Sequence, residues 1–271
     1  MSREEAGIMI NTIPSIAVYG LTGCAGELLV ILENLEKLLP RVRVASFPFA
    51  QSKNDDLKSI DIAFVEGSVS QKHDLEKLED IRRRTRWLVA VGNCAVWGCV
   101  QRGGCNRFEL AELKEASYGK GATIEALPAA PLKDHVRVDV ELSGCPINAT
   151  QFLAVTASLL QDHLPYITKK PVCLECKLRE NPCVLIEDDL PCLGPITAGG
   201  CGALCPSMGA ACYGCWGPCE EPQVEAMATV LEEKGFSLTE VQSRLLTFGA
   251  PPEIFERLMK TPAKNKVTKE A

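Results

Sequence analysis

Short apolar runs alternate with amphipathic or polar stretches over roughly the first 165 residues. A β-rich run, Ser15–Tyr19, is followed by a glycine-containing turn and by a periodic apolar stretch, Leu28–Leu39, that predicts a helix ending before Pro40. The highly charged segment Lys72–Arg86 predicts a second, polar helix. Further strands are predicted at Val42–Phe47, Ile60–Val65, Trp87–Val91 and Val136–Val140. Strands that alternate with helices in this way predict an α/β fold with a mostly parallel sheet.

The pattern changes after this region. The next stretch is irregular and rich in cysteine, glycine and proline, and apolar residues return at helical spacing only after Pro218. Short helices are predicted there at Val224–Lys234, Leu238–Phe248 and Pro251–Lys260. The sequence therefore predicts two domains, residues 1–165 with the parallel sheet and residues 166–271 with the cysteine-rich region.

Charge and hydropathy exclude several classes of function. The chain has 271 residues, a formal net charge of −6 and a pI near 5.3, which argues against nucleic acid as a partner. No stretch approaches the roughly 18 apolar residues that a membrane helix needs, so we expect no membrane insertion. The opening MSREEAGIMINT carries acidic residues and no export-signal pattern, which predicts a cytoplasmic location.

Cysteine is the residue type that carries the candidate chemistry. Of the 14 cysteines, eight lie close together in the second half of the chain. Since disulfides are uncommon in a reducing cytosol, thiol-rich motifs there indicate metal sites, and eight thiols suffice for two four-thiolate sites. Such sites fit either tetrahedral zinc or an iron-sulfur cluster. The eight are Cys173, Cys176, Cys183, Cys192, Cys201, Cys205, Cys212 and Cys215.

A third centre is predicted at one edge of the sheet. Cys24, Cys94 and Cys145 each stand near glycine in loops that follow predicted strands. Ligands bind beyond the carboxyl ends of the strands in open parallel sheets, and glycine lets the backbone pass close to a bulky inorganic group. Glu66 follows a strand at the same edge and is either a functional carboxylate or an ordinary strand end. Cys99 and Cys105 lie in a nearby glycine-containing loop and stay open as ligands.

Several ordered motifs give the chain a resemblance to a known family. It resembles the small, electron-transferring subunit of the [NiFe] hydrogenases, and within them the cytoplasmic multisubunit branch that includes the sulfhydrogenases and the F420-non-reducing hydrogenases. The resemblance covers nearly the whole chain. It rests on LTGCAGELLVIL, FVEGSV, VGNCAVWGC, SGCP, CLECKLRENPC, CLGPITAGGCGALCP and CYGCWGP.

The resemblance implies a flavodoxin-like amino-terminal domain with a proximal 4Fe-4S cluster. Its ligands would be Cys24, Cys94 and Cys145, with a fourth expected at the end of a C-x-x-C pair that starts at Cys24. This sequence has Glu27 at that position. Glu27 is therefore expected as an oxygen ligand, although clusters normally take thiolates. The alternatives are that Cys99 or Cys105 supplies the fourth ligand, or that the cluster has three irons.

The resemblance also divides the eight cysteines of the irregular carboxyl-terminal domain. The medial 4Fe-4S cluster would take Cys201, Cys205, Cys212 and Cys215. The distal 4Fe-4S cluster would take Cys173, Cys176, Cys183 and Cys192. Cys219 exceeds the requirement and is expected to be a buried thiol.

The function implied by the resemblance is electron transfer. The chain would relay electrons from the nickel-iron centre of a large partner subunit, through three iron-sulfur clusters, to a flavin-containing or other iron-sulfur subunit. No catalytic residue is expected in this chain, because the nickel-iron centre belongs to the partner. The alternatives are an iron-sulfur carrier of a non-hydrogenase complex, a hydrogen-sensing subunit, and a zinc-stabilised interaction module.

Overall fold

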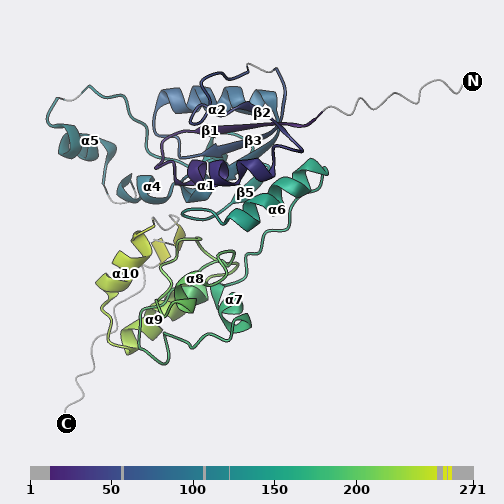
Figure 1. Ribbon diagram of the computed structural model, residues 1–271. Helices are drawn as coiled ribbons and strands as arrows, with labels where there is room; N and C mark the ends of the chain where they lie inside the picture. Colours follow the sequence, from purple (N-terminus) through teal and green to yellow (C-terminus); the bar gives the residue numbers. More distant parts are fainter. Residues whose placement is uncertain are drawn as a thin grey trace, which may run out of the picture.

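The computed structural model describes residues 13–55, 58–105, 108–121 and 123–248, and near the carboxyl end residues 253, 254, 256 and 257. Figure 1 shows a layered α/β region above a smaller, irregular region. The opening residues 1–12, on which the predicted location partly rests, lie outside the described part. No helix within the described ranges is long and apolar enough to span a membrane.

A single parallel sheet forms the centre of the first region. Its strand order is β2-β1-β3-β4-β5, and every neighbouring pair is parallel. This is the flavodoxin-like order, which confirms the predicted fold. The strands are β1 Ser15–Gly20, β2 Arg43–Ser46, β3 Ile60–Glu66, β4 Thr85–Val91 and β5 Val140–Leu142.

Helices cover both faces of the sheet (Figure 1). The first helices follow their predicted segments: α1 is Gly26–Asn34, continued by a 3-10 turn at Leu35–Lys37, and α2 is Lys72–Arg84. α1 and α6, Ala149–Leu160, pack on one face, where Phe64 meets Phe152 edge to face with ring centres 5.1 Å apart. α2 packs on the other face together with α3, Gly92–Trp97. The shorter elements α4 (Cys99–Cys105), α5 (Leu110–Tyr118) and a 3-10 turn (Leu132–Asp134) follow before β5.

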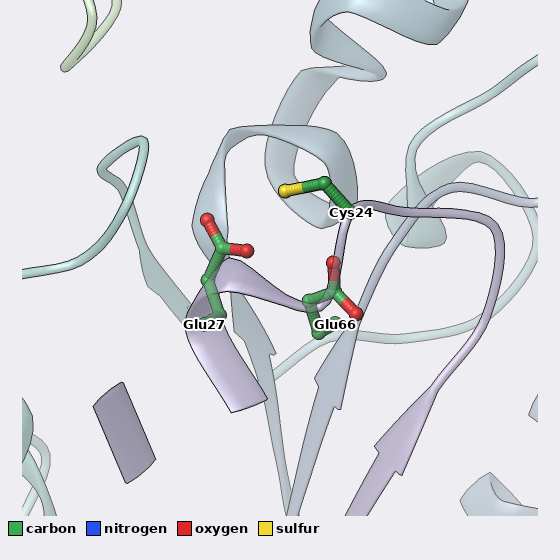
Figure 2. A group of neighbouring side chains, drawn as sticks. All are labelled: Cys24, Glu27 and Glu66. Atoms are coloured by element: carbon green, nitrogen blue, oxygen red, sulfur yellow. The ribbon is translucent and has the colours of Figure 1, made fainter. Parts of the chain in front are cut away.

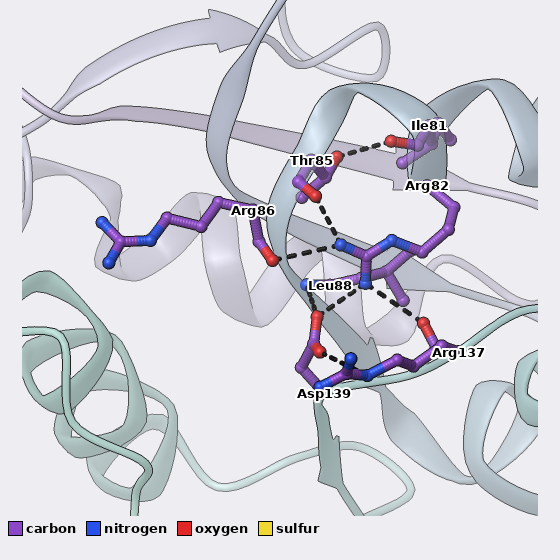
Figure 3. A network of polar contacts seen from close by, with 7 residues as sticks. All are labelled: Ile81, Arg82, Thr85, Arg86, Leu88, Arg137 and Asp139. Atoms are coloured by element: carbon purple, nitrogen blue, oxygen red, sulfur yellow. Dashed lines mark hydrogen bonds and ion pairs between the residues drawn. The ribbon is translucent and has the colours of Figure 1, made fainter.

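The last strand differs from the prediction. The sequence predicts a strand at Val136–Val140, but β5 begins at Val140. Figure 3 shows the reason: the Arg82 guanidinium donates to the Arg137 carbonyl at 3.1 Å and to Asp139 Oδ2 at 2.6 Å. The same Asp139 oxygen accepts the Leu88 N–H at 2.9 Å. Asp139 still donates its backbone N–H to the Leu88 carbonyl of β4 at 3.0 Å, but the Arg137 carbonyl accepts from Arg82 instead of from a strand.

Replacing Asp139 with alanine is expected to destabilise the sheet. Its side chain is 6% exposed, and the change removes the acceptor of the Leu88 N–H and the carboxylate partner of Arg82. Because hydrogen bonds to charged groups contribute about 1.5–3 kcal/mol, we expect the free energy of unfolding to fall by about 2 kcal/mol. Chemical denaturation with fluorescence detection measures it.

The matched control is Asp55→Ala, which breaks the exposed ion pair between Arg43 and Asp55. Exposed pairs contribute about 0–1 kcal/mol, so this variant should lose less than half as much. Equal losses in the two variants would show that the Arg82 network does not stabilise β5.

The second region contains short elements around its own core. It comprises α7 Val172–Leu178, a 3-10 turn at Gly194–Ile196, α8 Leu204–Ser207, α9 Val224–Glu233 and α10 Leu238–Leu246. The core combines aliphatic residues of α9 with cysteines such as Cys192 and Cys212. Two of the predicted helices are confirmed as α9 and α10. Of the predicted helix Pro251–Lys260, only residues 253, 254, 256 and 257 are described, and these are helical.

Candidate metal centres

The carboxyl edge of the sheet gathers the candidate residues of the first centre. Cys24 lies in the loop after β1, and Glu66 is the last residue of β3. Cys94 lies in α3, directly after β4, and Cys145 follows β5. The carboxyl ends of parallel strands meet at one edge, where open α/β sheets bind their ligands.

Two carboxylates and a thiol meet at this edge (Figure 2). The ligating atoms of Cys24, Glu27 and Glu66 all lie within 4.8 Å of one another. Glu27 comes from the first turn of α1, so the first strand-turn-helix unit supplies two of the three groups. The backbone N–H of Ala25 donates to Glu66 Oε1 at 3.3 Å, which fixes that carboxylate beside the loop. Glu66, whose role the sequence left open, thus belongs to the cluster of candidate ligands.

Two glycines leave room for these carboxylates. A Cβ atom at Gly92, whose φ is +81°, would lie 2.4 Å from Glu27 Oε1. A Cβ at Gly23 would lie 2.1 Å from Glu66 Oε1. Any larger residue at either position would therefore displace a carboxylate from the site.

The Glu27 carboxyl group is held in an environment that opposes its charge. The side chain is buried, and burial, reinforced by the nearby Glu66 and Cys145, raises its pKa to about 8. Burial also raises the pKa of Glu66. Glu27 Oε2 has no hydrogen-bond partner among the described residues. A buried carboxyl oxygen without a partner is costly unless a cation or donor meets it, so Glu27 fits a ligand position of a metal centre.

Cys94, Cys99 and Cys145 form a second group beside the first. The Cys99 thiol interacts with Cys145 and Cys94, which raises the pKa of Cys99 and lowers that of Cys145 to about 7. Cys99 Sγ also donates to the Phe248 carbonyl at 3.0 Å. The structure thus brings Cys99 close to two predicted ligands and leaves it a rival of Glu27 as the fourth. The side chain of Cys105 lies outside the described part of the chain.

The predicted distal ligands line one small cavity. The pocket is lined by Cys173, Cys176, Cys183 and Cys192, together with apolar neighbours such as Val184. Burial, together with Cys192, Cys176 and Cys183, raises the pKa of Cys173 to about 11. Four thiols around one pocket match a metal ion or cluster, and its positive charge would offset the burial that opposes the ionisation of Cys173.

The predicted medial ligands form an adjoining set. Burial raises the pKa of Cys215 to about 12, with further contributions from Cys201 and Cys205. Burial likewise raises the pKa of Cys212 to about 12, and both Cys192 and Cys215 add to it. The Cys212 N–H donates to Cys192 Sγ at 3.3 Å. Cys212 therefore lies between the medial and distal sets.

Exposure differs along these sets. Cys24 and Cys183 are exposed, whereas Cys94, Cys192 and Cys212 are buried. Every cysteine whose side chain the structure describes is a free thiol, which disfavours the disulfide alternative. Cys219 is buried and its Sγ donates to the Pro195 carbonyl at 3.6 Å, in line with the prediction of a buried thiol.

Glu175 is a functional candidate that sequence reasoning missed. It stands in the motif C-L-E-C, and its carboxylate accepts the backbone N–H groups of Gly200, Gly202 and Ala203 at 2.8, 3.0 and 3.2 Å. These residues flank Cys201. Helix α7, which carries the predicted distal ligands Cys173 and Cys176, thus holds the loop of the predicted medial ligand Cys201. In the sequence, the signal for this role was an acidic residue between two cysteines.

Comparison with known proteins identifies the family. Residues 22–159 match the family described as "NADH ubiquinone oxidoreductase, 20 Kd subunit". The chain belongs to this family. Over 225 residues it is 41% identical to sulfhydrogenase 2 subunit delta of Pyrococcus furiosus, covering 80% of this chain and 92% of that protein. It is 31% identical to a subunit of the F420-non-reducing hydrogenase of Methanococcus voltae, over 76% of this chain and 82% of that one.

Solved hydrogenases share its architecture. An NAD+-reducing [NiFe]-hydrogenase chain matches 58% of this chain and 96% of its own length, with a TM-score of 0.51 and 26% identity. A chain of the [NiFeSe] hydrogenase of Desulfovibrio vulgaris Hildenborough matches 80% and 97%, with a TM-score of 0.50 and 17% identity, and so supports the fold alone. The resemblance to the small subunit of [NiFe] hydrogenases is therefore confirmed. A relative from Archaeoglobus profundus, 28% identical over 257 residues, is named an iron-sulfur subunit.

Proposed function

We propose that this chain carries electrons between the large subunit of a [NiFe] hydrogenase and a further redox subunit, through three 4Fe-4S clusters. One observation carries the proposal: the three ligand sets form a continuous series in space. Cys145 influences the ionisation of both Cys24 and Cys215, which joins the proximal set to the medial one. Cys212 is influenced by both Cys192 and Cys215, which joins the medial set to the distal one. The sets therefore follow one another from the sheet edge into the irregular region.

The ligand assignment follows the motifs and this adjacency. The proximal cluster takes Cys24, Cys94, Cys145 and Glu27. The medial cluster takes Cys201, Cys205, Cys212 and Cys215, and the distal cluster takes Cys173, Cys176, Cys183 and Cys192. When bound, the clusters supply one-electron transfer. The protein contributes burial and hydrogen bonds to sulfur, such as that from the Cys212 N–H to Cys192, and these set the potentials.

The partners are inferred from the relatives. A large subunit with the nickel-iron centre would cover the sheet edge, since this chain holds the predicted proximal ligands there and Cys24 is exposed. At the other end, the exposed Cys183 places the distal set within reach of a second partner. A relative from Cupriavidus necator is a subunit of an NAD-reducing hydrogenase. We therefore propose a flavin-containing or other iron-sulfur subunit as the electron acceptor.

Metal analysis of the intact complex tests the proposal. Purified anaerobically through a tag on this chain, the complex should contain about twelve iron atoms per copy of the chain from the three clusters, with sulfide in similar amount. A nickel-containing large subunit should accompany it. Zinc with no sulfide would refute the clusters, whereas iron and sulfide without any nickel subunit would leave a carrier of another complex.

A further inference from the structure

A buried amide side chain lies where the proximal and medial ligand sets meet. Asn93 is the second residue of α3, two positions after the end of β4 and directly before Cys94, and it is 0% exposed. Its Oδ1 accepts the backbone N–H of Gly144 at 2.8 Å. Its Nδ2 donates to the carbonyl of Cys215 at 2.5 Å. The backbone N–H of Asn93 also donates to the Gly144 carbonyl, at 3.0 Å.

These hydrogen bonds connect three segments that carry predicted ligands. Asn93 adjoins Cys94, and Gly144 adjoins Cys145. The third partner is itself the medial ligand Cys215, which comes from the other region of the chain, 122 positions away. One side chain thus spans the boundary between the sheet edge and the irregular region at the point where two clusters would be neighbours.

Only an amide of this size satisfies both contacts. The carboxamide has an acceptor and a donor that point in different directions, and here each meets a separate backbone group. A carboxylate lacks the donor, and an aliphatic side chain lacks both. Because the site is buried, a backbone group that loses its partner cannot turn to water instead.

A second contact keeps the same junction closed. Trp97 lies on α3 one turn after Asn93, and its ring packs against the backbone of Gly217. A Cβ atom at Gly217 would lie 2.2 Å from the Trp97 ring. Gly217 follows Cys215 by two positions, so α3 touches the medial ligand segment through both its first and its last turn. The contact of Trp97 with Gly217 positions the segment that carries Cys215, and the hydrogen bond from Asn93 fixes the Cys215 carbonyl.

We propose that Asn93 is a positioning residue for electron transfer, which sets the separation of the proximal and medial clusters. This inference rests on the proposed function, because it requires clusters at both sets. Electron tunnelling slows steeply as the distance between two centres grows. An amide that fixes Cys215 against the segments of Cys94 and Cys145 would hold that distance short and constant.

The test compares Asn93→Ala with the wild-type complex by paramagnetic resonance. In wild type, the reduced proximal and medial clusters should show a mutual spin-spin splitting, which depends on their distance. In the Asn93→Ala complex the iron content should stay at the wild-type value while this splitting narrows. The reduction of the medial cluster by hydrogen should also slow, when followed by stopped-flow absorption.

The matched control is Asn34→Ala. Asn34 is another buried asparagine of the same region. Its Nδ2 donates to the Val30 carbonyl and its Oδ1 accepts from Lys37, so its hydrogen bonds do not reach Cys94, Cys145 or Cys215. It should lose stability and keep the wild-type splitting. Where the Asn93→Ala complex does not assemble, Asn93→Asp provides the test, because it has the same size and keeps the acceptor for Gly144 but removes the donor to Cys215.

The outcomes are distinguishable. An unchanged splitting and rate in an iron-replete Asn93 variant would overturn the role of Asn93 and leave the cluster assignment intact. A wild-type complex without any proximal or medial cluster signal would overturn the proposed function, and this inference with it.

Discussion

Removing iron from the chain is expected to unfold residues 166–248 and to leave the five-stranded sheet folded. The core of the second region contains Cys192 and Cys212, and Cys176 packs against it. Part of this core therefore consists of predicted cluster ligands. The helices there that carry cysteines, α7 and α8, have seven and four residues. Helices of this length are not stable alone, and metal binding to such a site contributes directly to the free energy of folding.

The sheet should behave differently because its core contains few ligands. Strand and helix residues such as Phe64 and Phe152 pack on one face, and Leu78 and Ile81 pack on the other. These contacts do not depend on the cysteine-rich region. We therefore expect the loss of the proximal cluster to loosen only the loops at the carboxyl edge.

Hydrogen exchange detected by mass spectrometry measures this difference. After anaerobic treatment with a chelator, the amides of α7 and α9 should lose most of their protection, and those of β3 and β4 should keep it. The sheet serves as the internal control in the same sample. Iron and sulfide added back should restore the protection of α7. Equal protection of both regions with and without iron would show that metal does not hold the second region together.

Glu27→Cys is expected to produce the largest change at the proximal cluster. Glu27 takes the position where a C-x-x-C pair from Cys24 would end, and its Oε2 has no hydrogen-bond partner among the described residues. A thiolate is a softer donor than a carboxylate. It should stabilise the oxidised cluster and lower its midpoint potential by roughly 60 mV or more, which is a tenfold change in the equilibrium constant for one electron. Redox titration followed by paramagnetic resonance measures the potential.

Glu66→Gln is the matched control for this experiment. Glu66 lies in the same group of carboxylate and thiol ligand atoms, yet the Ala25 N–H already occupies one of its oxygens. Replacing Glu66 removes a negative charge near the proximal cluster and should shift its midpoint potential. The number and type of cluster ligands stay the same, so the shape of the paramagnetic resonance spectrum should not change. If Glu27→Cys instead keeps the wild-type spectrum and potential, Glu27 is not a ligand, and Cys99 becomes the leading candidate.

Much of the fold was predictable because apolar runs mark buried parallel strands. The segments Ser15–Tyr19, Ile60–Val65 and Trp87–Val91 each match a strand within a few residues. The start of β5 was misplaced because the Arg137 carbonyl accepts from Arg82 instead of from a strand, and a side chain 55 positions away leaves no trace in local periodicity. α3 was also missed, since all six of its residues are buried and it has no polar face.

The candidate sites were predictable only in part. Cysteines beside glycine at strand ends indicated Cys24, Cys94 and Cys145, and the structure gathers them at one edge. Asn93 and Glu175 escaped notice because their significance depends on backbone groups far along the chain. The fourth proximal ligand stays a prediction, because Glu27 and Cys99 both lie beside the predicted ligands.

The uneven exposure of the ligand series has a consequence for biogenesis. Cys212 of the medial set is buried, while Cys24 of the proximal set and Cys183 of the distal set are exposed to solvent. Before the subunits assemble, dissolved oxygen would reach the outer clusters first and the inner one last. Partner subunits bound at both ends would then shield the outer clusters from oxygen. In air, unassembled copies of this chain would therefore lose the proximal and distal clusters before the medial one.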